Sequence, residues 1–402
     1  MFLESLLRRN AQFVAAAVRL HQAGRIPANS YVLDLDTIEA NSRVFSDAAH
    51  RCGLTVWAMT KQIGRVRPAL DAMLRGGVDG FVAVDTDCAR PIARAGHRLG
   101  HVGHLVQVPR DDAADVAAMR PAYWTVYSED KATEAARAGA GIGSEQRLLA
   151  RIHDPGDTFY PGHEGGFPAD RVVAVADWID ELEGAACAGV TTFPALLFEP
   201  RTGQVSPTPN LATIERAGEA LRAAGRAHVE VNAPGTTSVT VLDRLASAGA
   251  TQVEPGHGLT GTTPLHAVSA CPELPAALYL TEVSHHYGGR AYCFGGGLYV
   301  DPVFDPYQVT ALVGGSAEEA ISGGRVPAEL PSPASIDYYG QLTVPADRRA
   351  RTGDSVVFGF RIQAFFTRAH VVPVAGISTG EPRVEGIWRG DGSRVESGAA
   401  GR

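Results

Sequence analysis

The sequence has few cysteines, and their spacing does not pair them. Its 402 residues include 5 cysteines, at positions 52, 88, 187, 271 and 293. Their odd number and scattered positions favour reduced thiols over a disulfide framework or a zinc-binding motif. We therefore expect a cytoplasmic protein and no metal site.

Long apolar runs and an excess of positive charge are also lacking. No apolar stretch reaches the ~20 residues that a membrane-spanning helix requires. The segment Met1–Arg9 lacks the basic region and apolar core of a signal peptide and indicates an amphipathic helix to about Ala23. The formal net charge of −8 argues against a nucleic-acid partner, because phosphate binding favours a basic field. We expect neither a membrane nor a nucleic acid as partner.

The composition is globular, with 45% hydrophobic and 20% charged residues. The length fits a barrel of ~250 residues plus a smaller domain. From Tyr31 to about Thr263, short apolar runs alternate with Ala/Arg-rich segments of helical periodicity. About eight such units predict an α/β fold with a closed (β/α)8 TIM-type barrel. The expected strands are Tyr31–Asp36, Thr55–Met59, Gly80–Val84, Gly103–Val108, Tyr123–Val126, Leu148–Ile152, Val190–Leu197 and His228–Val231, with a ninth short apolar element at Gln252–Val253.

After Pro264 aromatic residues, Gly and Thr become more frequent, and strands no longer alternate with helices. This pattern predicts a mainly β C-terminal domain. Its expected strands are Leu278–Ser284, Ala291–Phe294, Ser355–Ile362 and His370–Val374, and Pro327–Pro333 is expected to be a turn or linker. We expect four parts: an N-terminal helical segment (1–27), a barrel (28–265), a β domain (266–380) and a flexible tail (381–402).

Lys61 directly follows the apolar, strand-like segment Leu54–Met59. An ammonium group delivered there has to be paired, hydrated or neutralised. A partly desolvated amine has a lowered pKa and attacks an aldehyde such as that of pyridoxal 5'-phosphate (PLP). Taken alone, the segment favours an ordinary solvated lysine, because most lysines near strand ends are solvated.

Several motifs, taken in order, resemble the alanine racemase-type barrel of PLP enzymes. The strand Tyr31–Asp36, followed by the Asn-containing segment Thr37–Asn41, resembles the opening of that family, and Lys61 matches its PLP lysine. Further matches in the same order are Arg151–Phe167, Gly189–Phe193 and Val253–Gly261. The resemblance implies PLP as cofactor, Lys61 as its Schiff-base lysine, and an amino acid or amine as substrate.

A bound phosphate needs converging backbone N–H donors and close approach without a Cβ. The segment 232–238 follows an expected strand and opens an expected helix, and 256–258 offers a second Gly-rich set. The candidates are Asn232, Gly235, Thr236, Thr237, Gly256 and His257. Both segments also fit ordinary turns. Arg65 lies where the racemases carry a phosphate-binding tyrosine, and it either serves the phosphate or is a surface residue.

Glu254 departs from the racemase pattern. Alanine racemases have an Arg at the matching position, whereas the basic amino-acid decarboxylases of this fold have a Glu. A carboxylate there would keep the pyridine nitrogen protonated and make the ring a stronger electron sink. The alternative is a solvated Glu at a strand end. His163, in a Gly-rich loop, is either a residue beside the ring or an ordinary polar loop residue.

The resemblance also implies that the β domain of a second subunit completes the pocket, so we expect a homodimer. A racemase needs a second base, and the candidates are His286, Tyr287 and Tyr339, each of which also fits an aromatic β core. The segment 337–339 has no Cys, unlike the Cys-Asp pair that the decarboxylases carry nearby. The preferred function is an amino-acid racemase or epimerase. The alternatives are a decarboxylase or D-amino-acid aldolase-type lyase, and a non-catalytic PLP- or phosphate-ligand-binding barrel.

Overall fold

The computed structural model describes residues 1–402 except 300, 305, 333 and 397–402, and it divides into two compact units. The barrel unit comprises Ser42–Thr60 and Leu74–Gly258. The β unit comprises Met1–Asn41, Lys61–Met73 and Leu259–Arg402. The chain therefore passes between the units several times, and Lys61 stands at one of these passages.

The barrel unit is built on a closed ring of parallel strands in the order β2-β3-β4-β5-β6-β8-β11-β12, with β12 pairing back to β2. This confirms the predicted TIM-type barrel. The strands are β2 (Thr55–Met59), β3 (Gly80–Ala83), β4 (Leu99–Val102), β5 (Tyr123–Val126), β6 (Gln146–His153), β8 (Ala185–Thr191), β11 (Glu230–Asn232) and β12 (Gln252–Val253). A short strand, β7 (Phe167–Pro168), adds to β6, and β9 (Leu196–Glu199) forms a hairpin with β10 (Gln204–Pro207).

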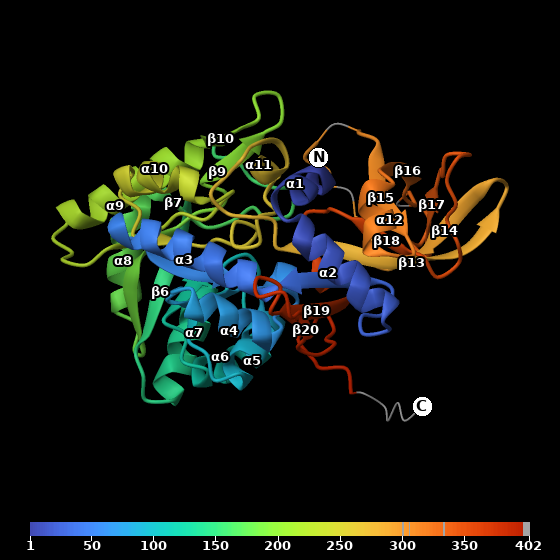
Figure 1. Cartoon of the computed structure of the whole chain (residues 1–402). Helices are drawn as coiled ribbons and strands as arrows, with labels where there is room; N and C mark the ends of the chain where they lie inside the picture. The colour runs from blue at the N-terminus through green and yellow to red at the C-terminus, as the bar shows by residue number, and fades with distance from the viewer. Residues whose placement is uncertain (300, 305, 333, 397–402) are drawn as a thin grey trace. The chain divides into compact units, whose positions relative to one another are not determined.

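Helices connect the parallel strands and cover them (Figure 1). All four residues of β3 are buried, as expected for a strand enclosed on both faces. Side-chain caps start two of the helices: Asp85 accepts from the amide of Cys88, and Ser128 accepts from that of Lys131. The helices of the barrel unit that follow its strands are α5 (Thr86–Arg94), α6 (Ala113–Ala118), α7 (Glu129–Gly141), α8 (Val172–Asp180), α9 (Pro209–Ala223) and α10 (Leu242–Ser247), whereas α4 (Arg67–Arg75), which follows β2 in the chain, belongs largely to the β unit.

Three of the expected barrel strands need correction. The segment expected at Tyr31–Asp36 forms β1 (Ser30–Asp34), which lies in the sheet of the β unit, and β12 supplies the eighth barrel strand. A fully buried five-residue strand has the same apolar pattern in either sheet, so the pattern did not reveal its partners. The strand expected at Gly103–Val108 is β4, which ends before Gly103, where φ is +76°. The run Val190–Leu197 divides between β8 and β9.

The β unit contains a nine-stranded sheet in the order β14-β17-β16-β15-β18-β13-β1-β19-β20. The strand that comes first in the chain, β1, pairs antiparallel with β13 and parallel with β19, so the sheet joins residues that are far apart in the sequence. The other strands are β13 (Ala277–Tyr287), β14 (Arg290–Phe294), β15 (Val309–Gly314), β16 (Arg325–Glu329), β17 (Tyr339–Leu342), β18 (Ser355–Phe358), β19 (His370–Ala375) and β20 (Arg383–Val384). The linker expected at Pro327–Pro333, of which residue 333 lies outside the described residues, is thus partly strand; Pro327 lies in β16 just before the residues that pair with β17, so its missing N–H breaks no ladder bond to that strand.

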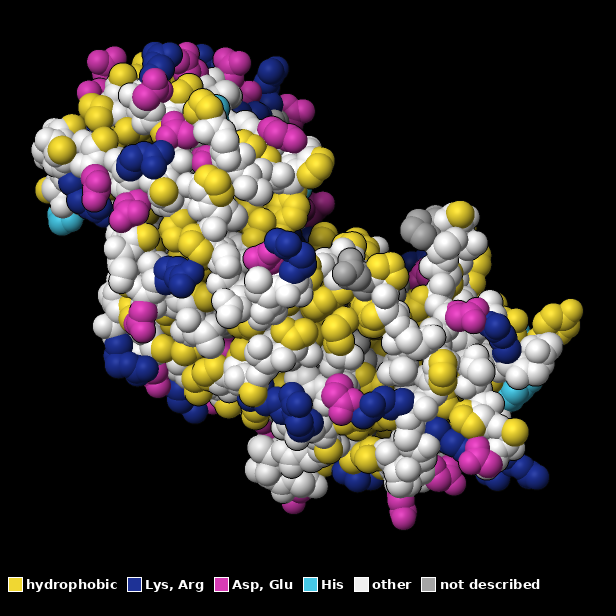
Figure 2. Space-filling view, turned by 90° about the horizontal axis from the view of Figure 1, so that it is seen from above, with side chains coloured by type: hydrophobic (Ala, Val, Ile, Leu, Met, Phe, Trp, Pro, Cys, Tyr) yellow, Lys and Arg dark blue, Asp and Glu magenta, His cyan; other side chains and the backbone are white. Residues whose placement is uncertain are grey.

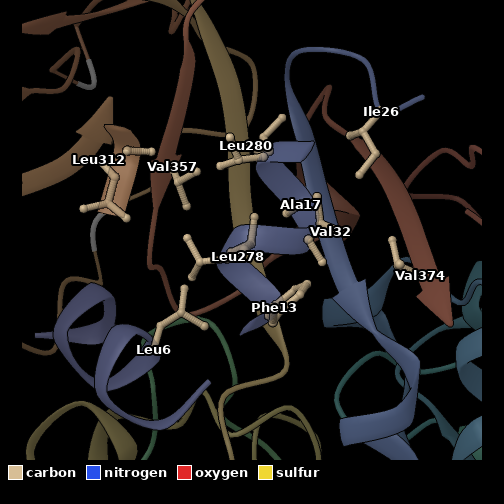
Figure 3. Close-up of a cluster of buried hydrophobic side chains, with 14 of the residues drawn as sticks. Leu6, Phe13, Ala17, Ile26, Val32, Leu278, Leu280, Leu312, Val357 and Val374 are labelled. Atoms are coloured by element: carbon tan, nitrogen blue, oxygen red, sulfur yellow. The ribbon is translucent and has the colours of Figure 1, made fainter. Parts of the chain in front are cut away.

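Two N-terminal helices, α1 (Phe2–Arg9) and α2 (Ala11–Gln22), pack on this sheet within the β unit. Figure 3 shows Leu6, Phe13 and Ala17 of the helices directed toward Val32 and Leu278 of the strands. Burial of such side chains contributes about 1.5–3 kcal/mol each before conformational entropy is subtracted. The remaining helices are α3 (Leu35–Arg51), which begins in the β unit and ends in the barrel unit, α11 (Pro264–Val268) and α12 (Ala317–Ser322).

The segment expected to be a flexible tail (381–402) forms regular structure in its described part, and residues 397–402 lie outside the described residues. It contributes β20 to the sheet, and Trp388 forms bridges with Val371 and Arg394. Its Gly, Arg and Ser content suggested fraying, but the backbone of Trp388 both donates to and accepts from Val371. Local composition does not reveal such a long-range pairing.

Among the described residues, no helix combines the length and apolar character needed to cross a membrane. On the face displayed in Figure 2, acidic, basic and hydrophobic side chains are interspersed.

Candidate functional site

Lys61 begins the short 3-10 helix η1 (Lys61–Ile63), two residues after the end of β2. Its Nζ lies 5.4 Å from the ring centroid of Phe365 in η5 (Ala364–Phe366), so the ammonium group has an aromatic face beside it. The turn after η1 is tightly packed, since a Cβ on Gly64 would lie 3.0 Å from Cγ2 of Val371. Within the β unit, Lys61 is therefore held on a short, closely packed turn.

Arg65 is buried, with 6% of its surface exposed, and its φ is +53°. Its guanidinium donates a hydrogen bond to the carbonyl oxygen of Gly390 at 2.6 Å. The alternative of a surface residue is thus wrong. One of its N–H donors is committed to the backbone around Gly390, which gives Arg65 a structural role in the β unit.

Glu254 follows β12 directly and is the centre of a buried polar cluster in the barrel unit. Its Oε1 accepts a hydrogen bond from Nδ2 of Asn232 at 2.9 Å and lies against Nδ1 of His101, while Oε2 lies 3.3 Å from Nε2 of His104. On its other ring nitrogen, His101 contacts Oγ1 of Thr125. The alternative of a solvated Glu at a strand end is wrong, because only 5% of Glu254 is exposed.

The charge state of Glu254 follows from this cluster. Burial alone raises the pKa of the carboxyl, but electrostatic interaction with His104 and His101, with hydrogen bonds from His101 and Asn232, outweighs it and leaves the pKa below its ordinary value. Glu254 is therefore an anion at neutral pH. Its Oε2 accepts no well-aligned hydrogen bond from any side chain in the described part of the chain.

A protonated pyridine nitrogen fits this arrangement. A buried, ionised carboxylate oxygen with remaining acceptor capacity suits a ring N–H donor. The residues present are thus compatible with the ring of PLP at Glu254. Asn232 was expected to belong to the phosphate-binding segment. Its side-chain Nδ2 instead donates hydrogen bonds to Oε1 of Glu254 and to Oγ1 of Thr191.

The Gly-rich segments form close backbone contacts in the barrel unit. The amide of Thr236 donates to the carbonyl of Leu196 at 3.0 Å, so it is already engaged, and the hydroxyl of Thr237 donates to the carbonyl of Gly235. A Cβ on Gly235 would lie 2.6 Å from the carbonyl oxygen of Leu196, and a Cβ on Gly258 would lie 2.4 Å from that of Thr237. These glycines are therefore required by the packing of the two segments against their neighbours. Gly256 and His257 lie in the half-buried turn that directly precedes Gly258.

His163 belongs to an aromatic group on the barrel unit. Its ring centroid lies 6.3 Å from that of Phe193 and 5.9 Å from that of Tyr160, and Phe193 in turn lies 5.5 Å from His104. The aromatic group thus extends from the Glu254 cluster to the loop that carries His163.

Buried Arg151 fixes this loop. Its guanidinium donates to the carbonyl oxygens of His163 at 2.7 Å and Phe193 at 3.3 Å, and it contacts the hydroxyl of Tyr127. Tyr127 donates in turn to the carbonyl of His104 at 2.8 Å. One cationic side chain therefore links the loop to the strand end that carries the two histidines.

The β-unit candidates lie at the surface of the single chain. His286 and Tyr287 stand at the end of the β13–β14 hairpin, where Nε2 of His286 lies 2.9 Å from the carbonyl of Ala350 and Tyr287 is 76% exposed. Tyr339, on β17, is 42% exposed and packs edge-on against His285. The reading of these three residues as an aromatic β core is wrong, because all three are exposed.

Sequence reasoning missed His101, His104 and Arg151 as individual site residues. The two histidines enclose a Val-Gly pair directly at the end of β4, and this spacing after an apolar run was the available signal. The expectation of no metal site also came from the spacing of possible ligand residues in the sequence. In the described part of the chain, possible ligand atoms come together in two groups, His101/His104/Glu254 and His266/Cys271/Glu273.

Sequence comparison relates the chain to known families over most of its length. Residues 33–264 match the family model described as alanine racemase, N-terminal domain, and residues 278–384 match the one described as YhfX-like, C-terminal domain. The chain is 39% identical over 388 residues to the "Uncharacterized protein YhfX" of Escherichia coli (strain K12). This alignment covers 96% of this chain and 98% of the relative.

Solved structures with the same architecture include enzymes of several reaction types. A D-threonine aldolase from Filomicrobium marinum has a TM-score of 0.66 at 17% identity, covering 90% of this chain and 94% of that one. A D-threo-3-hydroxyaspartate dehydratase from Delftia sp. HT23 has a TM-score of 0.63 at 19% identity, covering 89% and 96%. An alanine racemase from Corynebacterium glutamicum has a TM-score of 0.60 at 17% identity, covering 83% and 90%. At these identities the likeness establishes the fold.

Proposed function

The chain belongs to the alanine racemase N-terminal domain family, and from this premise we propose that it is a PLP-dependent enzyme acting at Cα of an amino acid or related amine. The observation that carries the proposal is the buried Glu254 anion, whose Oε2 accepts no well-aligned hydrogen bond from the described side chains. His104, His101 and Asn232 pair with this buried carboxylate, and Oε2 keeps acceptor capacity for one more donor. A protonated ring nitrogen is a suitable partner.

Lys61 is the residue proposed to carry the coenzyme. It follows β2, whose last amide, that of Met59, donates to the carbonyl of Pro255, the neighbour of Glu254. Chain connectivity thus brings a lysine to within two residues of the strand end that contacts the Glu254 segment. The coenzyme, when bound, supplies an electron sink for a bond broken at Cα.

Other residues of the chain have separate proposed roles in holding the coenzyme and moving protons. Glu254 would hold a proton at the ring nitrogen of the bound coenzyme, and His101, His104 and Asn232 keep Glu254 ionised and oriented. Gly256 and His257 are proposed to line the phosphate. Gly235, Thr236 and Thr237 are proposed to lie beside it, and the amide of Thr236 and the hydroxyl of Thr237 would have to exchange their present hydrogen bonds in order to donate to it. Lys61 is proposed to remove or return the α-proton on one face of the substrate.

The preferred reaction is racemisation or epimerisation, with a β-unit residue of a second subunit as the other base. This rests on the exposure of His286, Tyr287 and Tyr339, which are available to a partner chain. Further exposed hydrophobic residues of the β unit suit burial in a homodimer: Ile336 is 62% exposed, Tyr338 61% and Phe366 56%.

A lyase is the second candidate, and one observation favours it. Within one chain, His286 and Tyr287 make their contacts at the far end of a hairpin, and a lyase needs no second base on the opposite face. Glu254 suits both reactions, because a protonated ring assists cleavage of any bond to Cα.

Trapping and product analysis together test the proposal. Borohydride reduction of PLP-loaded protein, followed by peptide mass spectrometry, is expected to find the adduct on Lys61, and Lys61→Ala is expected to abolish it. Incubation with single amino acids, with chiral composition, CO₂ and aldehyde followed in parallel, separates the racemase from the lyases. An adduct at another lysine, or none, would contradict the coenzyme assignment.

A further inference from the structure

A second polar cluster lies in the β unit, in the segment that runs from Leu259 to β13. It consists of His266 in α11, Cys271 and Glu273, whose exposed fractions are 1%, 2% and 0%. One ligand atom from each residue lies within 4.8 Å of the other two. An imidazole, a thiol and a carboxylate thus converge in the interior, at a place where an apolar core would be the ordinary filling.

The backbone around this cluster is fixed by side chains from other elements of the β unit. The guanidinium of Arg9 donates to the carbonyl oxygens of Cys271 at 2.5 Å and Glu273 at 2.9 Å. The amide of Asn41 donates to the carbonyl of Leu274 at 2.8 Å and accepts from its N–H at 2.8 Å. A preorganised backbone of this kind is what a metal site needs to hold its ligands in place.

His266 is oriented toward the cluster by a second contact. Its Nδ1 lies 2.6 Å from Oγ1 of Thr263, and its Nε2 lies 3.4 Å from Oε2 of Glu273 without making a hydrogen bond. Metal-binding histidines commonly donate one ring N–H to a neighbour, which leaves the lone pair of the other nitrogen for the ion. The ring of His266 has this arrangement when Nδ1 carries the proton, and Nε2 then presents its lone pair to Glu273 and Cys271.

We propose that His266, Cys271 and Glu273 bind a divalent metal ion, with zinc as the preferred species. Nitrogen, sulfur and carboxylate oxygen are the three ligand types that zinc takes in proteins. Binding would release the thiol proton of Cys271 to solvent, and the dication would then balance the thiolate beside the Glu273 carboxylate. Three protein ligands leave the fourth tetrahedral position to a small ligand such as water. Because all three side chains are buried, the ion has a structural role, tying α11 to the loop before β13.

Metal analysis of the full-length protein tests this site. After treatment with chelator, incubation with Zn²⁺ and desalting, the wild-type chain is expected to retain about one zinc ion, and Cys271→Ser and His266→Gln are each expected to lose affinity by more than roughly 100-fold, since removing a residue that only orients a ligand already costs about 10- to 100-fold. Cobalt substitution is expected to give a sulfur-to-metal charge-transfer band that Cys271→Ser abolishes.

The matched control is Cys293→Ser, which removes another buried thiol of the same unit that belongs to neither group of possible ligands. It is expected to keep the zinc, as is Lys61→Ala, so this site is tested separately from the coenzyme. If Cys271→Ser does not fold, His266→Gln and X-ray absorption of the wild-type cobalt form decide. Zinc lost on desalting, or retained equally by Cys271→Ser, indicates an adventitious ion only and overturns the proposal.

Discussion

Nε2 of His104 lies 3.3 Å from Oε2 of Glu254, although the first residue follows β4 and the second follows β12 of the barrel unit. With His101 and Asn232 on the other oxygen, this places two imidazoles around one buried carboxylate. The arrangement holds Glu254 as an anion, which can keep a neighbouring ring nitrogen protonated.

Glu254→Gln is expected to lower kcat/KM by roughly 10- to 1000-fold, because an opposite charge near a titrating group moves its pKa by about 1–3 units. Without the carboxylate, the ring nitrogen would lose its proton at neutral pH. Coenzyme content is expected to persist. The matched control is Glu230→Gln, which removes a carboxylate that hydrogen-bonds Tyr123 and Gln252 within the same unit. Equal losses in the two variants would contradict the assigned role.

His104→Gln is expected to raise the pKa of Glu254, because the imidazolium charge of His104 is one of the causes that lower it. The acid limb of the kcat/KM profile should therefore move to higher pH in the variant. A full pH profile of both proteins checks this, with kcat and KM separated. A uniform loss of rate at every pH would indicate a purely structural role for His104.

We expect the free energy of unfolding of the β unit to depend on pH because of His21. Burial lowers its pKa, and the opposing effect of Glu282, 3.4 Å away, does not restore it. The unfolded chain then binds more protons than the folded one, so the free energy of unfolding decreases as pH falls below about 6.5, by at most about 1.4 kcal/mol per pH unit. Urea unfolding of wild type and His21→Gln between about pH 7.5 and about pH 5 measures this. Parallel curves for the two proteins would exclude His21 as the cause.

Phe13→Ala is expected to destabilise the β unit by about 3–5 kcal/mol, the usual loss for a fully buried Phe. Phe13 is 0% exposed and packs with Val32 and Leu278 (Figure 3). Val268→Ala, at a position that is 46% exposed, is the control and should change the free energy of unfolding by less than about 0.5 kcal/mol. Chemical denaturation followed by circular dichroism gives both values.

Ile336→Asp is expected to shift the protein toward monomer, because Ile336 is 62% exposed among other large apolar side chains and a charge at an interface core is costly to desolvate. Sedimentation velocity over a range of concentrations measures the shift. The control is Val44→Asp, also at an exposed apolar position but in the barrel unit. A wild-type protein that is monomeric at all concentrations contradicts the proposed homodimer.

The sequence predicted the barrel because strand–helix alternation is a local property that persists over many units. It did not predict that β1 leaves the barrel, since pairing partners are set by contacts across hundreds of residues. The same distinction applies to the site. Lys61 and Glu254 were visible because each follows an apolar run, whereas His101 meets Glu254 across 153 residues only when the barrel closes. Arg151 was hidden for a related reason, because its partners are backbone carbonyls with no sequence signature.

The position of β1 has a consequence for synthesis on the ribosome. Its partner strands β13 and β19 begin at Ala277 and His370, so Ser30–Asp34 remains without them until nearly the whole polypeptide has emerged. Domains generally fold as units while the chain is being made. The nascent chain must therefore keep the apolar strand β1 shielded while the barrel folds. A message truncated before codon 370 would yield a product in which β1 lacks β19 and exposes an unpaired strand edge that can aggregate.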